Sequence, residues 1–138
     1  MRGTSYVLTA RAEADLHQAR IWSQARWGTQ LTNRYFDDLH EGAQYIAQNY
    51  ASLRVRDDLA GGTVLLLCPV REHYIVYEPL TPKFIAIVAV IGRGRDVPSI
   101  LQKWAPALRR ELSEIRALIA SGAIRPPAAR EPKSRRKK

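Results

Sequence analysis

The sequence has few of the residues that bind metals or form disulfides. Its 138 residues include one cysteine and three histidines. Cys68 has no second cysteine with which to form an internal disulfide or a zinc site. His17, His40 and His73 fall on separate predicted elements without the spacing of metal ligands, so we expect each to be a lone surface histidine. The sequence therefore predicts no metal site and no cofactor.

Long apolar runs are also absent. No stretch approaches the roughly 20 apolar residues that cross a bilayer. The first residues, MRGTSYVLTARAEADL, lack the apolar segment of a secretory signal. The apolar content of 46% and the charged content of 25% are typical of a globular domain. We therefore expect a cytoplasmic protein with no membrane partner.

Positive charge exceeds negative charge, and much of the excess lies at one end. Lysine and arginine number 22 against 13 for aspartate and glutamate, which gives a net charge of +9. Residues 123–138 hold seven basic residues and one acid, so this segment carries +6. Its three prolines are incompatible with a packed element, and we interpret it as a basic disordered tail. Attraction to nucleic acid or another polyanion is the alternative interpretation.

The first part of the chain predicts a short strand and a helical hairpin. Residues 5–9 alternate loosely as a strand, and Thr9 is a plausible N-cap. Apolar residues then recur at helical spacing from Ala12 to Trp22, and again from Leu31 to Ile46. Gly28 separates the two stripes. Two helices with one apolar face each, joined by a short turn, are expected to lie on another apolar layer.

The next part predicts that layer, a sheet. Residues 63–70, 73–77 and 84–91 read as strands, a turn is expected between Pro79 and Pro82, and residues 53–56 suggest a short edge strand. The run FIAIVAVI at 84–91 is apolar throughout, which indicates a central strand buried on both faces. The order β–α–α–β–β–β predicts an α+β fold in which a helical hairpin packs on a twisted antiparallel sheet.

An added C-terminal helix follows. An apolar stripe runs from Leu101 to Ile119, and Gly122 is its stop signal. Because proline disrupts helix interiors, Pro106 predicts a short helix ending at Ala105 and a longer one over residues 106–121.

Arginines mark the point where the most apolar strand ends. In the stretch VAVIGRGRD, Arg93 and Arg95 are two residues apart, so on extended backbone both side chains point to one side. We expect Arg54, Arg56 and Arg71, from neighbouring edges, to join them in a basic patch. Guanidinium groups grip phosphates and carboxylates, so the patch suits RNA, DNA or an acidic protein segment. Pairing of Arg95 with a nearby carboxylate is the alternative.

These motifs resemble those of the RelE/ParE superfamily of type II toxin–antitoxin toxins, and most of all its ParE branch. The resemblance rests on YVLTARAEADL, RWG, HYIVYEP and IAIVAVIGRGRD, in that order. It covers about residues 5 to 97. We therefore expect a toxin domain at 1–97, a helical extension at 98–122 and the basic tail at 123–138.

The resemblance implies a toxin that is neutralised by a cognate antitoxin docking between the hairpin and the sheet. Antitoxin contacts would then fall on Leu16, Trp22, Tyr35 and Leu39. ParE-like members inhibit DNA gyrase, whereas RelE-like members are endoribonucleases that cut messenger RNA on the ribosome. The arginines at 93, 95, 54, 56 and 71 would contact the target.

The two activities differ in the chemistry they need. RNA cleavage requires proton transfer as well as cationic stabilisation. After Ile91 this chain has neither the tyrosine nor the histidine of RelE-like enzymes. If the chain were a ribonuclease, its catalytic candidates would be Arg93, Arg95, Arg71, Tyr77 and His73. We favour the gyrase inhibitor, which is not an enzyme. A nucleic-acid-binding or assembly module is a further alternative.

The C-terminal helix departs from the family pattern, in which chains usually end near residue 97. Its apolar stripe needs a partner. It would cover the chain's own sheet, form a homodimer, or occupy the antitoxin groove, and the first is the simplest.

Overall fold

The computed structural model describes residues 5–126 and confirms the expected α+β fold. It consists of β1 (Tyr6–Leu8), α1 (Ala10–Asn49), β2 (Leu66–Val70), β3 (His73–Thr81), β4 (Phe84–Gly92) and α2 (Val97–Ala120), with short 3₁₀ helices at Tyr50–Ser52 and Asp57–Leu59. Most of the predicted tail at 123–138 lies outside the described residues. In the described part of the chain no helix is both long and apolar enough to cross a membrane.

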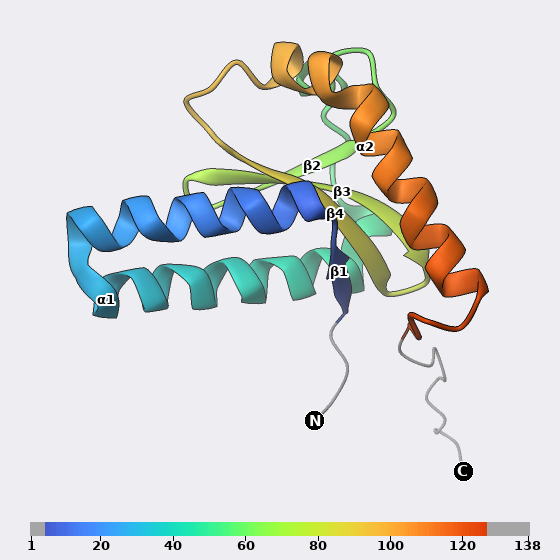
Figure 1. The fold of residues 1–138 in the computed structure, drawn as a ribbon. Coiled ribbons are helices and arrows are strands. Elements are labelled where there is room, and N and C mark those ends of the chain that lie inside the picture. Colours follow the sequence, from blue (N-terminus) through green and yellow to red (C-terminus); the bar gives the residue numbers. More distant parts are fainter. Residues whose placement is uncertain (1–4, 127–138) are drawn as a thin grey trace.

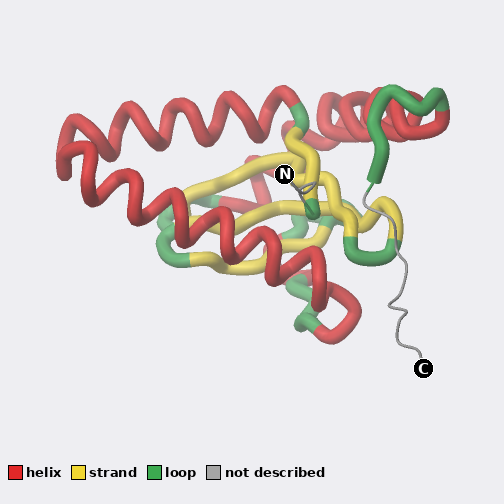
Figure 2. Tube along the Cα trace, turned by 90° about the horizontal axis from the view of Figure 1, so that it is seen from below, coloured by secondary structure: helices red, strands yellow, loops and turns green. Residues whose placement is uncertain are grey.

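The helix α1 is the predicted hairpin. Gly28 interrupts it with a left-handed backbone (φ 86°, ψ 171°), which a residue without a side chain adopts readily. We call residues 10–27 the first arm and 29–49 the second arm. Figure 1 shows the two arms side by side, with their turn projecting beyond the sheet. In Figure 2 the arms diverge as they leave that turn.

The sheet has the strand order β1–β4–β3–β2. β2, β3 and β4 form the predicted antiparallel meander, and β1 lies parallel to β4, with Tyr6 opposite Ile85. The sheet is therefore mixed rather than antiparallel throughout. Thr9 connects this edge to α1, because its hydroxyl caps the helix at Ala12 N (3.1 Å) and donates to the Val88 carbonyl (3.1 Å).

β4 is buried on both faces, as its composition predicts. Every residue from Phe84 to Ile91 is buried. On one face, side chains such as Ile85 and Ile87 pack with α1 residues including Ile46. On the other face, Val88 and its neighbours pack against a stripe of α2 made of Leu101, Leu108, Leu112 and Ile115. The extension thus covers the chain's own sheet, which was the simplest of the three expectations.

Pro106 does not divide the C-terminal helix, contrary to the prediction. α2 runs unbroken from Val97 to Ala120. The proline leaves the Gln102 carbonyl without its intrahelical donor, but Gln102 is exposed, so water can reach this group. Figure 1 shows that α2 changes direction partway along its length, as a helix with an internal proline does. Burial of the apolar stripe on the sheet outweighs the lost hydrogen bond.

Three strand boundaries also differ from the prediction. Residues 53–56 form no strand. β2 starts at Leu66, because the Thr63 hydroxyl donates to the Ala60 carbonyl (2.7 Å) and accepts from Leu65 N (3.2 Å), which holds the preceding residues in a turn. β3 continues through Pro79, where a shift in register accommodates a residue without an N–H, and the turn narrows to Pro82 and Lys83.

Truncation of α2 tests whether this helix belongs to the core. Leu108 is 1% exposed against the sheet, so Leu108→Ala should lower the free energy of unfolding by about 2–5 kcal/mol, measured by denaturant titration. Leu118, on the same helix, is 43% exposed and provides the control, since Leu118→Ala should change stability by less than about 0.5 kcal/mol. Equal effects of the two substitutions would show that α2 does not pack on the sheet.

Candidate functional site

A cleft of about 730 Å³ lies between the hairpin and the ends of β3 and β4. Trp22 of the first arm, with Trp27 beside the hairpin turn, contributes aromatic surface, and Arg93 and Arg95 contribute the positive charge. We call it the Trp–Arg cleft after these four residues. Because the hairpin projects past the sheet (Figure 1), residues that are more than 60 positions apart in the sequence come together here.

Arg93 and Arg95 lie in the turn between β4 and α2. Arg95 N donates to the Gly92 carbonyl (3.1 Å), and Val97 N donates to the Arg95 carbonyl (2.9 Å), so the backbone of this turn is fixed. Both side chains are exposed and both line the cleft. The Arg93 guanidinium donates to the Arg71 carbonyl (3.2 Å). The structure thus brings together the two arginines that the sequence singled out.

Neither of these arginines forms an ion pair with a carboxylate in residues 5–126. The alternative expectation, pairing of Arg95 with a neighbouring carboxylate, is not what the structure shows. Asp96 instead caps α2 by accepting from Ser99 N (3.4 Å). Two guanidinium groups without an ion pair therefore face the cleft, where Arg93 bonds to a backbone carbonyl and Arg95 attracts the Asp15 carboxylate from beyond ion-pair distance.

The other three arginines of the predicted patch lie elsewhere. Arg71 forms an ion pair with Asp38 (2.6 Å) and stacks on the Tyr35 ring at 5.1 Å, so it borders the cleft without lining it. Arg56 donates two hydrogen bonds to Asp58 (3.1 and 3.0 Å), and these lower the pKa of that carboxyl. Arg54 is exposed and also does not line the cleft. The sequence could not reveal these pairings, because they depend on side-chain placement after folding.

His73 lies at the floor of the cleft and is not a lone surface histidine. Its Nδ1 is 2.6 Å from the Tyr35 hydroxyl, which also accepts a hydrogen bond from Glu72 N (3.0 Å). The direction of the Tyr35–His73 bond follows from the tautomer, and we assign the neutral ring its proton on Nε2, with the hydroxyl donating to Nδ1. Burial lowers the pKa of His73 and raises that of Tyr35, so both are neutral at pH 7.

Tyr77, His40 and His17 are the remaining residues for which the sequence made a prediction, and none of them lines the cleft. Tyr77, a candidate for proton transfer, is only 2% exposed in the core, and burial raises its pKa to about 12. It does not line the cleft. His40 is bonded through Nδ1 to the Tyr6 hydroxyl (2.6 Å), contrary to the expectation of a lone side chain, whereas His17 is exposed.

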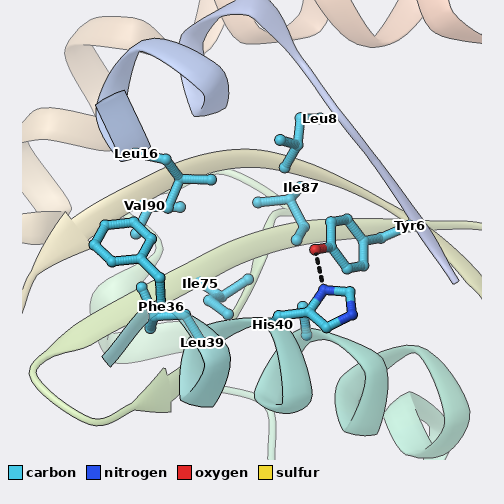
Figure 3. A pocket seen from close by; sticks show the side chains of 10 residues that line it. Tyr6, Leu8, Leu16, Phe36, Leu39, His40, Ile75, Ile87 and Val90 are labelled. Atoms are coloured by element: carbon cyan, nitrogen blue, oxygen red, sulfur yellow. Dashed lines mark hydrogen bonds between the residues drawn. The ribbon is translucent and has the colours of Figure 1, made fainter. Parts of the chain in front are cut away.

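A second, smaller cavity of about 90 Å³ lies beneath the hairpin next to the cleft. Figure 3 shows its apolar lining, with Leu16 and Leu39 among the side chains and the Tyr6–His40 hydrogen bond at one side. Of the residues expected to bind the antitoxin, Leu16 and Leu39 line this cavity, while Trp22 and Tyr35 line the cleft. All four therefore lie on the sheet-facing side of the hairpin.

Asp15 lines the cleft and fixes its wall to β4, a role that sequence reasoning did not find. Its carboxylate accepts from Val90 N (2.9 Å) and lies 3.4 Å from Arg11 Nε, an ion pair without the alignment of a hydrogen bond. Desolvation raises the pKa of Asp15. The Arg11 guanidinium is 3.3 Å from the centre of the Trp104 ring, and Glu111 accepts from Arg11 N (3.2 Å). α2 thus holds the start of the first arm against β4.

The described residues contain no group of three or more histidine, cysteine, aspartate or glutamate side chains that could hold a metal ion. The cleft itself is lined by cationic, aromatic and hydrogen-bonding side chains. Such a set suits binding of an anion or an aromatic ring.

Comparisons with known proteins agree with this architecture. Residues 6–97 match the family described as the ParE toxin of type II toxin–antitoxin systems, parDE. The chain is 27% identical over 94 residues to Toxin ParE of Escherichia coli, an alignment that covers 68% of this chain and 89% of that protein. A solved structure, the chromosomal ParDE TA system from P. aeruginosa, has a similar fold, with a TM-score of 0.52 and 15% identity over 64% of this chain and 95% of that one.

The protonation of His73 is testable by NMR. Because burial lowers its pKa, the ring should titrate below the ordinary value of about 6.5. The unfolded chain binds this proton at higher pH than the folded chain does. His73 therefore destabilises the fold as the pH falls below about 6.5, and its contribution is favourable above that pH.

Tyr35→Phe removes the hydroxyl that donates to Nδ1, so the pKa of His73 should rise in this variant. Tyr45→Phe, at an exposed position of the second arm, is the matched control and should leave the titration unchanged. Titration of wild-type His73 at or above about 6.5 would contradict the burial of this ring.

Proposed function

The chain belongs to the ParE toxin family of type II toxin–antitoxin systems, and from this premise we propose that it inhibits DNA gyrase in the cytoplasm. As a toxin of such a system, it has a cognate antitoxin as partner. The observation that carries the proposal is the pair of exposed arginines, Arg93 and Arg95, which form no ion pair in residues 5–126 and lie just beyond the end of β4.

The chemistry of the pair supports a target with an anionic surface. Guanidinium groups bind carboxylates and phosphates through planar, two-pronged contacts. Binding of an anion breaks no ion pair of either group and competes only with the Arg93 hydrogen bond to the Arg71 carbonyl and the attraction of Arg95 to Asp15. We assign target binding first to Arg93 and Arg95. Arg71, at the border of the cleft, and Arg54 and Arg56, farther away, take secondary places in the proposed contact surface.

The antitoxin docks, in this proposal, along the sheet-facing side of the hairpin. Trp22 is 53% exposed and is positioned for direct contact. Tyr35 and Leu39 are each 5% exposed, so their contribution is to hold the hairpin in the shape that the antitoxin meets. Leu16 is half-buried over the small cavity, so part of its side chain is available for direct contact.

We further assign the toxic activity to residues 1–97 and a covering role to residues 98–122. The apolar stripe of α2 is already used against the sheet, so it is not free to form a homodimer or to occupy the antitoxin groove. A homodimer through another surface stays a prediction.

The alternative activity, RNA cleavage on the ribosome, gains one supporting feature. His73 lies in the cleft with Arg93 and Arg95, so a histidine is near the cations after all. Its hydrogen bonding argues against catalysis, because Nδ1 is engaged by the Tyr35 hydroxyl and the assigned tautomer places the proton on Nε2. A neutral ring in this tautomer donates a hydrogen bond but offers no free nitrogen as a general base. We therefore keep gyrase inhibition as the proposal.

Purified protein should inhibit DNA supercoiling by gyrase, and Arg93→Ala with Arg95→Ala should weaken that inhibition at least about tenfold, as expected for loss of two charge-assisted contacts. Arg109→Ala with Arg110→Ala removes the same charge from exposed positions on α2 and should leave inhibition unchanged. Both double variants should melt within a few degrees of the wild type.

Undiminished inhibition by the Arg93/Arg95 variant would overturn the assigned role of the pair. If supercoiling is unaffected by the wild type while ribosome-bound messages are cut, the target is the ribosome. His73→Gln should then abolish the cleavage.

A further inference from the structure

We propose that the Trp–Arg cleft binds single-stranded nucleic acid, with unpaired bases stacked on Trp22 and Trp27 and backbone phosphates held by Arg93 and Arg95. This site is additional to the gyrase proposal and does not depend on it.

The aromatic side chains of the cleft form a continuous series. The rings of Trp22 and Trp27 meet edge to face at 5.2 Å, Trp27 lies 6.4 Å from Tyr35, and Tyr35 lies 5.7 Å from His73. The series leads from the hairpin turn to the sheet. At its outer end, Trp22 and Trp27 remain 53% and 45% exposed. Large exposed ring faces beside a charged groove are the usual platform for unpaired bases.

The charges of the cleft favour an anion. Arg93 and Arg95 are free of ion pairs within residues 5–126. Arg26 does not line the cleft, but its guanidinium lies 4.7 Å from the centre of the Trp22 ring. Of the two lining carboxylates, Asp15 accepts from Val90 N, pairs with Arg11 and is attracted by Arg95, and Glu72 is exposed. A phosphate backbone passing Arg93 and Arg95 therefore meets positive charge.

The residues that line the cleft fit a flat ligand with rings better than they fit a peptide helix. Helix-binding grooves are mainly aliphatic, because they accept apolar side chains at helical spacing. Among the residues that line this cleft, the aliphatic ones are Ala19 and Val90. The aliphatic side chains gather instead around the smaller cavity, which at about 90 Å³ admits no more than a small apolar group. The Trp–Arg cleft therefore suits nucleic-acid bases better than the leucine side chains of a peptide helix.

The size and position of the cleft set which nucleic acid fits. A volume of about 730 Å³ lies within the range of ligand sites that hold one or two ring systems. Bases in a duplex are covered on both faces by their neighbours, so they cannot stack on tryptophan unless they are unstacked first. The cleft therefore favours a single strand, and duplex DNA should bind only through phosphate contacts.

Binding is measured with the full chain and a fluorescein-labelled ten-nucleotide oligothymidine, by fluorescence anisotropy at several salt concentrations. Trp22→Ala and Trp27→Ala should each raise the dissociation constant by between about 5-fold and 150-fold. Tyr45→Ala removes an exposed aromatic outside the cleft, 59% exposed, and should have no effect. Because residues 123–138 remain in every variant, their non-specific attraction is the same throughout.

Arg93→Gln with Arg95→Gln tests the phosphate contacts. Loss of two contacts should reduce the slope of log affinity against log salt by about 1.4 for a single strand. Arg109→Gln with Arg110→Gln removes the same net charge from α2 and should change the slope less.

The proposal is overturned if Trp22→Ala and Trp27→Ala bind the oligonucleotide like the wild type, because binding then comes from general positive charge. It is also overturned if an acidic peptide, but not oligothymidine, quenches the tryptophan fluorescence of the wild type and this quenching is lost in Trp22→Ala. Neither result bears on gyrase inhibition, which is measured separately by supercoiling.

Discussion

Burial of β4 on both faces is the constraint on which the rest of the molecule depends. A strand whose eight residues from Phe84 to Ile91 are all buried needs an apolar layer above and below it. α1 supplies one layer and α2 the other. The strand must leave the core where neither layer covers it, and Gly92 marks that exit. Arg93 and Arg95 are exposed because they are the first side chains beyond both layers.

The cleft follows from a mismatch in length between the hairpin and the sheet. The arms of α1 extend past the strands (Figure 1), so aromatic side chains near their turn have no sheet to pack on. They face the charged end of β4 instead. α2 contributes at a distance, because Trp104 and Glu111 hold Arg11, and Arg11 holds Asp15 beneath Val90 N. The covering helix and the binding cleft are thus parts of one packing arrangement.

Patterns with a local cause could be predicted from the sequence. Helical spacing predicted both arms of α1, and the run at 84–91 predicted a central strand. Arg93 and Arg95 do line one cleft, but they lie in a turn and not on the extended backbone from which the prediction was made. Elements decided by tertiary packing were missed, as with the unbroken helix through Pro106, which burial against the sheet stabilises. The Tyr35–His73 bond joins residues 38 positions apart, so no local pattern indicates it. The pairs Arg71–Asp38 and Arg56–Asp58 likewise depend on where the turns place their side chains.

The small apolar cavity beneath the hairpin has a mechanical consequence. The hairpin and the sheet leave about 90 Å³ unfilled between Leu16, Leu39 and the strands (Figure 3). Hydrostatic compression favours states in which such voids are eliminated, since the volume lost on unfolding scales with the internal empty space. Pressure is therefore expected to act on the contact between α1 and the sheet, and the space of about 430 Å³ beside α2 gives the opposite face of the sheet a site of the same kind.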